Sequence, residues 1–177
     1  TPARFEHPGV VRVFDLDEPL SAIAMERVLG GSVRKELGKG RLAPPRLARW
    51  FRTAAEALAH VHASGVVHRD IKPSNILLRS DDRVVLTDFG LACERGFGPT
   101  SGVPEGTLGY MPAEQRAGAP ASPAMDVAAF GASLREALEH TTSAPSPRLA
   151  ELATACLREA PSARPSAEEL ARALAAA

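Results

Sequence analysis

The amino-acid sequence predicts one α+β domain, because strand-like segments come first, helical segments dominate the remainder, and a single hairpin is embedded between two helices. The chain has 177 residues, which is enough for one hydrophobic core and too few for two comfortable domains. No internal repeat is visible in it. We therefore expect a mainly helical domain with two strands at its start and one hairpin in its middle.

Two short strands open the predicted domain, over residues 10–16 and 20–28, with an acidic turn between them. Gly30-Gly31 ends the strand pattern, and residues 32–37 form a short helical segment. Pro44-Pro45 then begins the clearest helix. Its apolar residues recur at steps of three and four, as one face of a helix requires: Leu47, Trp50, Phe51, Ala54, Leu58 and Val61.

The hairpin is predicted from two apolar runs, residues 75–78 and 83–87, which flank a polar turn at 79–82. Residues 90–123 follow and hold seven of the 14 glycines. Such a composition predicts a long loop, and long loops in compact domains are usually functional.

The last part of the chain is predicted to be helical. Apolar spacing indicates helices around residues 127–138 and 149–157. A final helix is predicted from Ser166, because Ser166 and Glu169 have the spacing of a capping box.

Charge and cysteine content exclude several classes of protein. There are 21 basic and 21 acidic residues, so no basic excess favours nucleic acid as a partner. The two cysteines, Cys93 and Cys156, form no disulfide framework or metal-binding pattern, which indicates a reducing compartment and a cytoplasmic location. No apolar run reaches membrane-spanning length, and nothing at the start resembles a signal peptide.

Residues 67–78 read VHRDIKPSNILL, a loop in which two basic side chains, a carboxylate and a carboxamide lie within eight residues. Packing alone rarely requires that combination, whereas phosphoryl transfer does. Negative charge spreads over the equatorial oxygens in the transition state, so the site needs a cation, metal ligands and one positioned carboxylate.

This stretch resembles the catalytic loop of protein kinases, whose pattern is H-R-D-x-x-x-x-N. By that resemblance Asp70 accepts or orients the proton of the attacking hydroxyl, and Lys72 neutralises charge on the transferred phosphoryl group. Asn75 holds one Mg²⁺. The resemblance therefore implies ATP and Mg²⁺ as cofactors and a hydroxyl of a protein substrate as the acceptor.

Asp88-Phe89-Gly90 follows Asn75 by thirteen residues, directly after the second strand of the hairpin. It resembles the DFG motif of the same family, in which the aspartate binds Mg²⁺ beneath the phosphates. Amide and carboxylate oxygens at one hairpin base suit a hard cation. Asn75 and Asp88 are therefore the expected metal ligands.

Residues 106–115, GTLGYMPAEQ, are similar to the family segment G-T-x-x-Y-M-A-P-E-Q, with the alanine and proline transposed. The resemblance implies that Thr107 contacts Asp70 and Lys72 and helps to recognise a Ser or Thr acceptor.

Two further residues match structural positions of the family. Glu114 is expected to pair with Arg164 of the segment PSARPS. Asp126, before the helix predicted at 127–138, matches the aspartate that fixes the backbone of the catalytic loop.

The start of the chain is similar to the fourth and fifth strands of the kinase N-lobe and the hinge that follows them, through HPGVVRVFDL and AIAMERVLGGS. By that resemblance Met25 is the gatekeeper. Glu26 and Val28 offer backbone groups to adenine, and Leu77 packs beneath the adenine ring.

The same resemblance divides the chain into residues 1–28, residual N-lobe strands and hinge, and residues 29–177, the kinase C-lobe. The Gly-rich phosphate loop and the lysine of the third strand do not appear, since the first lysine is Lys35, past the hinge. We expect this missing part of the N-lobe upstream of Thr1. Residues 139–147 are also short where the family usually has a substrate-docking helix.

Three function classes remain, and a fragment of a functional Ser/Thr protein kinase, inactive alone, is the favoured one. A pseudokinase or scaffolding module would explain the missing Gly-rich loop and lysine above the ATP site. It would have no physical reason, however, to keep every catalytic residue expected in the C-lobe. A small-molecule phosphotransferase of the aminoglycoside-kinase type shares the Asp…Asn…Asp pattern but lacks Lys72 in this setting and the segment 106–115.

The sequence also suggests a control site. Arg69, beside Asp70, can pair bidentately with a phosphate group on the glycine-rich segment. Between Gly90 and Gly106 the only hydroxyl side chains are Thr100 and Ser101. We therefore expect regulatory phosphorylation at one of them.

Overall fold

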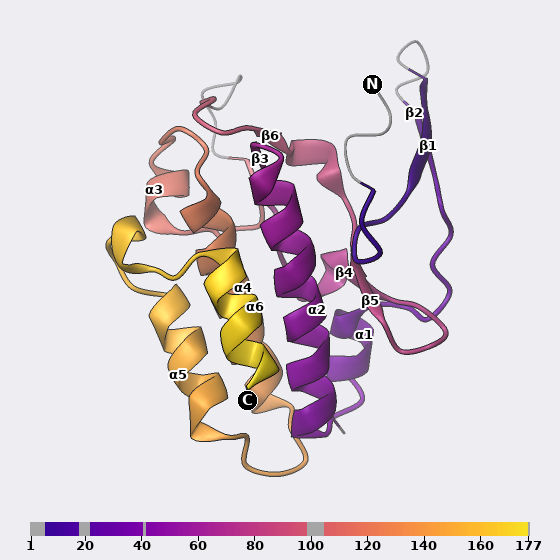
Figure 1. Cartoon of the computed structure of the whole chain (residues 1–177), viewed down its shortest axis with the longest axis vertical. Helices are drawn as coiled ribbons and strands as arrows, with labels where there is room; N and C mark the ends of the chain where they lie inside the picture. The colour runs from indigo at the N-terminus through magenta and orange to yellow at the C-terminus, as the bar shows by residue number, and fades with distance from the viewer. Residues whose placement is uncertain (1–5, 18–21, 41, 99–104, 177) are drawn as a thin grey trace.

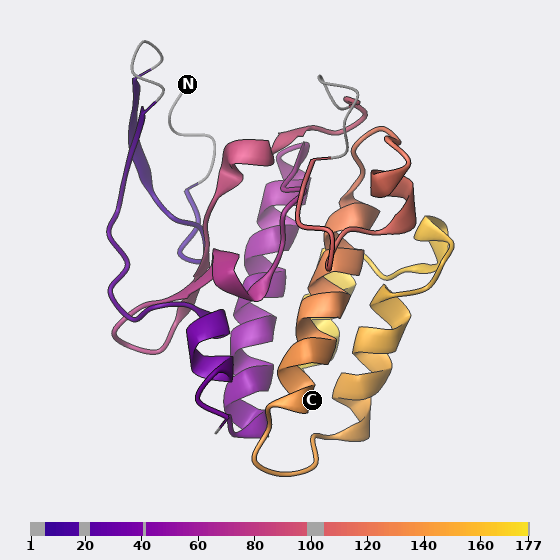
Figure 2. The same ribbon diagram turned by 180° about the vertical axis from the view of Figure 1, so that it is seen from behind.

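The longest helix, α2 (Pro44–Ala63), runs through the middle of the domain and contacts both α4 (Pro123–Glu139) and α6 (Ala167–Ala175). Figures 1 and 2 show α5 (Pro147–Cys156) on the far side of α4, so the helices form one bundle. The computed structural model describes residues 6–17, 22–40, 42–98 and 105–176.

Helix α2 confirms the prediction made from its apolar spacing. Pro44 stands at the first helical position, where its missing N–H costs no hydrogen bond. The face that carries Trp50 and Phe51 is buried, and Phe51 meets Phe130 of α4 edge to face, with 5.3 Å between the ring centroids. This contact joins the two longest helices at the centre of the core.

The C-terminal helices agree with the predicted ones, with different bounds. Helix α4 begins at Pro123, so Asp126 lies inside its first turn and not before the helix as expected. Ser166 and Glu169 form the predicted capping box of α6. Helices α4 and α5 pack so closely that a Cβ atom on Gly131 would lie 2.4 Å from the Cβ atom of Cys156.

The strands form three separate two-stranded antiparallel sheets among the described residues. β1 (Val13–Asp17) pairs with β2 (Ala22–Met25), and β3 (Val66–Val67) pairs with β6 (Cys93–Glu94). β4 (Ile76–Leu78) and β5 (Val84–Leu86) form the predicted hairpin. In Figure 1, β1 and β2 project beside the upper part of the bundle, away from α5 and α6.

The structure corrects the bounds predicted for the first strands. Residues 9–11 do not belong to the β1–β2 ladder, because they bond β5 through Val11 N to Leu86 O at 2.8 Å and Leu86 N to Gly9 O at 2.8 Å. The second strand ends at Met25, three residues earlier than predicted. Most of the predicted turn between the two strands lies outside the described residues.

Short elements complete the chain. Helix α1 (Val33–Leu37) confirms the short helix predicted at 32–37. The segment predicted as one long loop carries the 3₁₀ turn η2 (Phe89–Leu91), strand β6 and helix α3 (Ala113–Arg116). Two further 3₁₀ turns, η1 (Pro73–Asn75) and η3 (Pro161–Ala163), precede β4 and α6.

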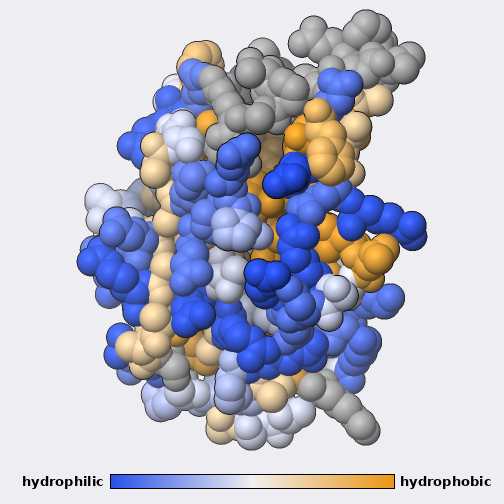
Figure 3. All heavy atoms as spheres, turned by 45° about the vertical axis from the view of Figure 1, so that its right-hand side comes forward, coloured by the Kyte–Doolittle hydropathy of each residue, from blue (hydrophilic) through white to orange (hydrophobic). Residues whose placement is uncertain are grey.

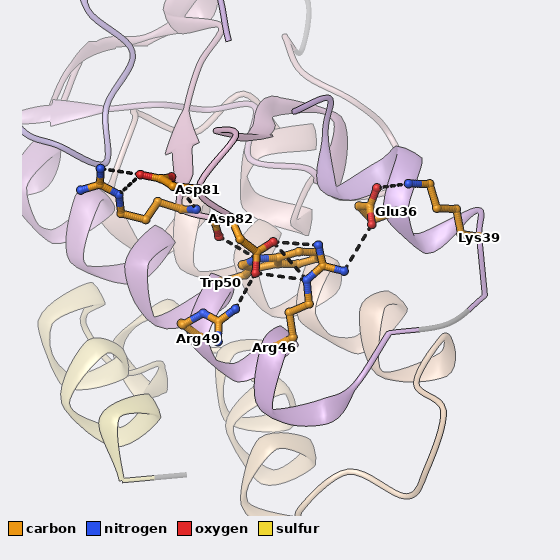
Figure 4. A network of polar contacts seen from close by, with 8 residues as sticks. Glu36, Lys39, Arg46, Arg49, Trp50, Asp81 and Asp82 are labelled. Atoms are coloured by element: carbon orange, nitrogen blue, oxygen red, sulfur yellow. Dashed lines mark hydrogen bonds and ion pairs between the residues drawn. The ribbon is translucent and has the colours of Figure 1, made fainter. Parts of the chain in front are cut away.

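The turn of the β4–β5 hairpin is held to α2 by a polar network (Figure 4). Asp82 binds Arg46 at 2.7 Å and also pairs with Arg49, while its backbone oxygen accepts the indole N–H of Trp50 at 3.1 Å. Arg46 stacks over Trp50, with its guanidinium carbon 4.4 Å from the ring centroid, and reaches Glu36 of α1. The residues predicted as an ordinary polar turn therefore anchor the hairpin.

Candidate active site

Asp126 fixes the loop that carries the candidate catalytic residues. Its side chain is fully buried, and its two oxygens accept the backbone N–H groups of His68 and Arg69 at 2.7 Å each. His62 lies 2.8 Å from the same carboxylate. A buried carboxylate requires such partners, and here they hold the catalytic loop against α4 as the resemblance implied.

The loop is also joined to the DFG segment. His68 Nε2 lies 2.9 Å from the backbone oxygen of Thr87, and the His68 ring packs on Phe89 with 4.6 Å between centroids. Arg69 and Asp88 have left-handed backbone conformations, with φ of 69° and 64°. Non-glycine residues rarely adopt positive φ, and such strain concentrates at functional sites.

Asp70, Lys72 and Thr107 form a closed set of hydrogen bonds. The Lys72 ammonium donates to Asp70 Oδ2 at 2.6 Å and to Thr107 Oγ1 at 2.7 Å. The Thr107 hydroxyl and backbone N–H both donate to Asp70 Oδ1, at 2.7 and 3.1 Å. Burial by itself raises the pKa of Asp70, but the bonds from Lys72 and Thr107 outweigh it and leave that pKa lowered. The carboxylate is therefore ionised at neutral pH.

Asn75 and Asp88 lie beside this set, at the base of the hairpin. Asn75 Nδ2 donates to the backbone oxygen of Asp70 at 2.9 Å and lies 3.4 Å from Asp88 Oδ2. Within the described ranges, no group of three or more His, Cys, Asp or Glu side chains could hold a metal ion. Two oxygen-bearing side chains fit Mg²⁺, which typically takes one or two protein ligands and completes its shell with water and substrate phosphates.

Thr107 is held in place by its neighbours on both sides in the chain. Gln115 Nε2 donates to the backbone oxygens of Arg69 and Glu105, at 2.8 and 2.7 Å. A Cβ atom on Gly106 would lie 2.8 Å from that nitrogen, and Gly106 has φ of 135°, so this position requires glycine. The motif resemblance assigned no role to Gln115, because the two groups that accept its hydrogen bonds are backbone oxygens in other segments of the chain.

The predicted partner of Glu114 is present. Arg164 pairs with Glu114 through both guanidinium Nη atoms, the second at 3.2 Å, and only 4% of the Arg164 side chain is exposed. The pair ties α3 to the segment before α6, although the alanine and proline ahead of Glu114 are transposed.

The hinge runs along the strand that carries Leu77. Gly30 N donates to Leu78 O at 2.8 Å, and Leu78 N donates to Gly31 O at 2.9 Å. A Cβ atom on Gly30 would lie 2.3 Å from Leu78 O, which explains the glycine pair of the sequence. Leu77 and Val28 are half-buried.

Glu26 and Met25 lie at the start of this hinge. The Glu26 carboxylate takes two hydrogen bonds from Arg79, at 2.7 and 2.8 Å, and these lower its pKa. Met25 is 45% exposed, with its sulfur 4.0 Å from the Thr87 hydroxyl, next to Asp88. The predicted hinge is thus joined to the hairpin through Arg79 and through Thr87, the residue before Asp88.

Comparison with known proteins assigns this arrangement to a family. The family model described as a protein kinase domain matches residues 2–146 of the chain. The chain belongs to the protein kinase family. The fold agrees, since a mainly helical domain with small sheets is the C-lobe architecture that the resemblance implied.

Several bacterial kinases are similar in sequence. Serine/threonine-protein kinase PkaA of Streptomyces coelicolor is 36% identical over 201 aligned positions, which cover 97% of this chain and 37% of PkaA. DNA damage-responsive serine/threonine-protein kinase RqkA of Deinococcus radiodurans is 40% identical over 76% of this chain and 21% of its own length. Serine/threonine-protein kinase PknA of Mycobacterium tuberculosis is 36% identical over 74% of this chain. The chain thus spans between a fifth and two fifths of the relatives it matches.

The sequence did not predict a polar cluster formed by Arg34, Tyr110 and Glu136. Tyr110 donates its hydroxyl to Glu136 at 2.6 Å, and Arg34 contacts both side chains. Burial and the Glu136 carboxylate raise the pKa of Tyr110 to about 12, so the phenol stays protonated and keeps donating. The cluster joins α1 and α4 to the segment after Thr107, and no spacing rule connects its three members.

No helix in the described part of the chain combines the length and apolar character that crossing a membrane requires.

Proposed function

We propose that this chain carries the catalytic half of an ATP-dependent Ser/Thr protein kinase, which transfers the γ-phosphoryl group of ATP to a Ser or Thr hydroxyl of a protein. The observation that carries the proposal is the hydrogen-bonded set of Asp70, Lys72 and Thr107 beside Asn75 and Asp88. The kinship with PkaA, RqkA and PknA supports it.

Each member of the set has a distinct role in this proposal. Asp70 accepts a hydrogen bond from the attacking hydroxyl, orients it toward the γ-phosphorus and takes its proton as the new O–P bond forms and the bond from the γ-phosphorus to the β–γ bridging oxygen breaks, which releases ADP. Lys72 offsets the negative charge on the transferred phosphoryl oxygens. Thr107, which is bonded to both, would help to recognise the Ser or Thr acceptor.

Asp88 and Asn75 would hold Mg²⁺, which when bound neutralises charge on the phosphates. Asn75 would offer its Oδ1 atom, since its nitrogen faces Asp70 and Asp88 in this structure. Asp88 is exposed, so its carboxylate is accessible to a metal ion.

The adenine site is proposed to lie at the hinge. Backbone groups of Glu26 and Val28 would bind the base, and Leu77 would pack beneath it. In this proposal residues 1–28 are the strands and hinge of the N-lobe and residues 29–177 are the C-lobe. We place the reaction in the cytoplasm, where ATP is supplied and where unpaired cysteines such as Cys93 and Cys156 persist.

The test is Asp70→Asn in the natural full-length protein that contains this chain. The substitution keeps the shape of the side chain and removes its charge, so phosphate transfer to protein should fall by about 10²–10⁴ while ATP binding persists. Glu151→Gln, an exposed change on α5, is the matched control and should leave turnover unchanged. Equal turnover for Asp70→Asn and wild type would refute the catalytic assignment.

The pseudokinase alternative gives a different result in the same experiment. Wild-type protein would then show no transfer above the Asp70→Asn background, although the domain is folded.

A further inference from the structure

The buried guanidinium group of Arg69 already pairs with an anionic side chain, Glu105. Only 7% of the Arg69 side chain is exposed, and its Nη2 atom lies 3.0 Å from Oε2 of Glu105. The other partners of the guanidinium are weaker, since Nη1 lies 3.5 Å from Leu91 O and 3.7 Å from Cys93 Sγ. A buried guanidinium cannot lose its proton, so removing Glu105, its one charged partner among the described residues, would be costly.

The backbone around this pair is fixed independently. The Gln115 amide donates to the backbone oxygens of both Arg69 and Glu105, so the two residues are also joined through their main chains. Gly106, which follows Glu105, has no room for a side chain between Gln115 and Arg69. The position of Glu105 is therefore set by the same contacts that hold the loop.

The pair lies next to the reacting groups. Arg69 precedes Asp70 in the chain, and Glu105 stands two residues before Thr107. Asp70 and Thr107 are themselves hydrogen-bonded at 2.7 Å. The two segments are therefore joined by two adjacent contacts, the ion pair of Arg69 with Glu105 and the hydrogen bond from Thr107 to Asp70. A shift of Glu105 would move Thr107 relative to Asp70.

We propose that Glu105 is a positioning residue whose carboxylate supplies the anion that Arg69 requires, so that the catalytic arrangement forms without a phosphate group on the preceding loop. This inference rests on the proposed function and concerns the regulation of the same site. The sequence predicted instead that Arg69 pairs with a phosphate group on Thr100 or Ser101. Both of these residues lie outside the described part of the chain.

The charges around the Arg69 guanidinium favour Glu105 over a phosphate group as its anionic partner. With Glu105 in place, the guanidinium has a carboxylate on one Nη atom and a carbonyl oxygen and a sulfur atom near the other. A doubly charged phosphate brought to the same guanidinium would meet the Glu105 carboxylate at close range, and like charges repel. A phosphate would have to displace Glu105, which Gln115 holds by its backbone.

The first experiment measures phosphate transfer by the natural full-length protein. Thr100→Ala/Ser101→Ala, with mass spectrometry to establish that the loop is unphosphorylated, should keep kcat within about twofold of wild type. Glu105→Gln should lower kcat by about tenfold to a hundredfold, because small displacements of reacting groups have effects of this size, with the KM for ATP changed less than threefold. Glu105→Asp keeps the charge and should recover part of the loss. Glu151→Gln is the control.

A second readout separates positioning from general damage. Arg69→Gln/Glu105→Gln removes both charges together, so its loss should be no greater than that of Glu105→Gln alone, since the buried cation is gone as well. Additive losses in the double variant would contradict the coupling.

Hydrogen exchange on the same proteins decides the question even if the wild type transfers no phosphate and the proposed function fails. Backbone amides of residues 105–111 should exchange faster in Glu105→Gln than in wild type and Glu151→Gln, and should be unaffected by Thr100→Ala/Ser101→Ala. Full activity and unchanged exchange in Glu105→Gln would overturn the inference, and so would a tenfold loss of kcat in the alanine pair.

Discussion

Asp88 combines three properties that single it out among the aspartates of the hairpin. It follows β5, it has positive φ, and its carboxylate faces Asn75 at 3.4 Å. Aspartate tolerates the left-handed conformation better than most residues. This leaves its oxygens at the hairpin base and its neighbour Phe89 packed on His68.

We predict that Asp88→Ala in the full-length protein abolishes the Mg²⁺-dependent part of nucleotide binding, because it removes the one charged metal ligand at that base. The measurement is calorimetric titration with ATP, with and without Mg²⁺. Asp81→Ala is the suitable control, since Asp81 is exposed and its partner among the described residues is Arg83. Asp82 is no control, because it anchors the hairpin turn to α2. A similar loss with Asp81→Ala would indicate a general effect of surface charge.

At the scale of elements, the β4–β5 hairpin connects the candidate active site to the helical core. Asn75 and Asp88 flank its base, while its turn is clamped by Asp82 to Arg46, Arg49 and Trp50 of α2 (Figure 4). Burial of Val84 and Leu86 fills the space between these ends. The hairpin is therefore fixed at both ends, so the candidate metal ligands at its base are held in place.

Substitutions of Asp82 should destabilise the domain by graded amounts. Asp82→Asn removes the charge that binds two arginines and should cost about 1 kcal/mol in free energy of unfolding, in the range for partly exposed charged hydrogen bonds. Asp82→Ala should cost about 2 kcal/mol, because Asp82 has φ of 66° and alanine adds strain there. Urea unfolding of the full-length protein measures both, and Asp81→Asn should leave the midpoint nearly unchanged. Equal midpoints for Asp82→Ala and wild type would show that the network around Asp82 contributes no stability.

Regular elements and motif positions could be predicted from the sequence, because both depend on local spacing. The apolar steps of α2, the capping box at Ser166 and the hairpin at 75–87 are all patterns within about 20 residues. The contacts of Glu105 and Gln115 could not be predicted in this way. They depend on a left-handed Arg69 and on segments that are distant in the chain.

The bounds of the first strands were wrong for a related reason. Val10 and Val11 are apolar and strand-like, but they are buried against β5 and not in the β1–β2 ladder. A strand pattern predicts an extended backbone and does not specify its partner.

The whole molecule is asymmetric in how it covers its apolar side chains. The helical bundle buries its core, whereas the β1–β2 sheet holds three of the six large apolar side chains that are exposed among the described residues, with Phe14 60% exposed, Ile23 47% and Met25 45%. Figure 3 views the molecule from the side of these strands, and apolar surface lies there among hydrophilic side chains. Two strands alone are marginally stable in water, so this sheet and the hinge after it need further cover.

We therefore predict that residues 1–177 alone bind ATP weakly and transfer no measurable phosphate to protein, because the phosphates would stay hydrated and the hinge would be poorly held. A longer natural protein that contains this chain and covers these strands should show both activities. ATP titration and phosphate transfer to a generic protein substrate, compared for the two proteins, test this. Ordinary kinase rates from residues 1–177 alone would contradict the prediction.

The buried carboxylate of Asp126 has a consequence for the order in which the molecule assembles. Its partners, His68 and Arg69, lie 58 and 57 residues earlier in the chain. Until Asp126 is present, these two backbone N–H groups lack the carboxylate that holds the loop. During synthesis, which proceeds from the N-terminus, the catalytic loop must therefore wait in an unfixed conformation until α4 has left the ribosome. A nascent chain that already contains the proposed catalytic residues up to Thr107 still lacks the carboxylate that fixes their loop.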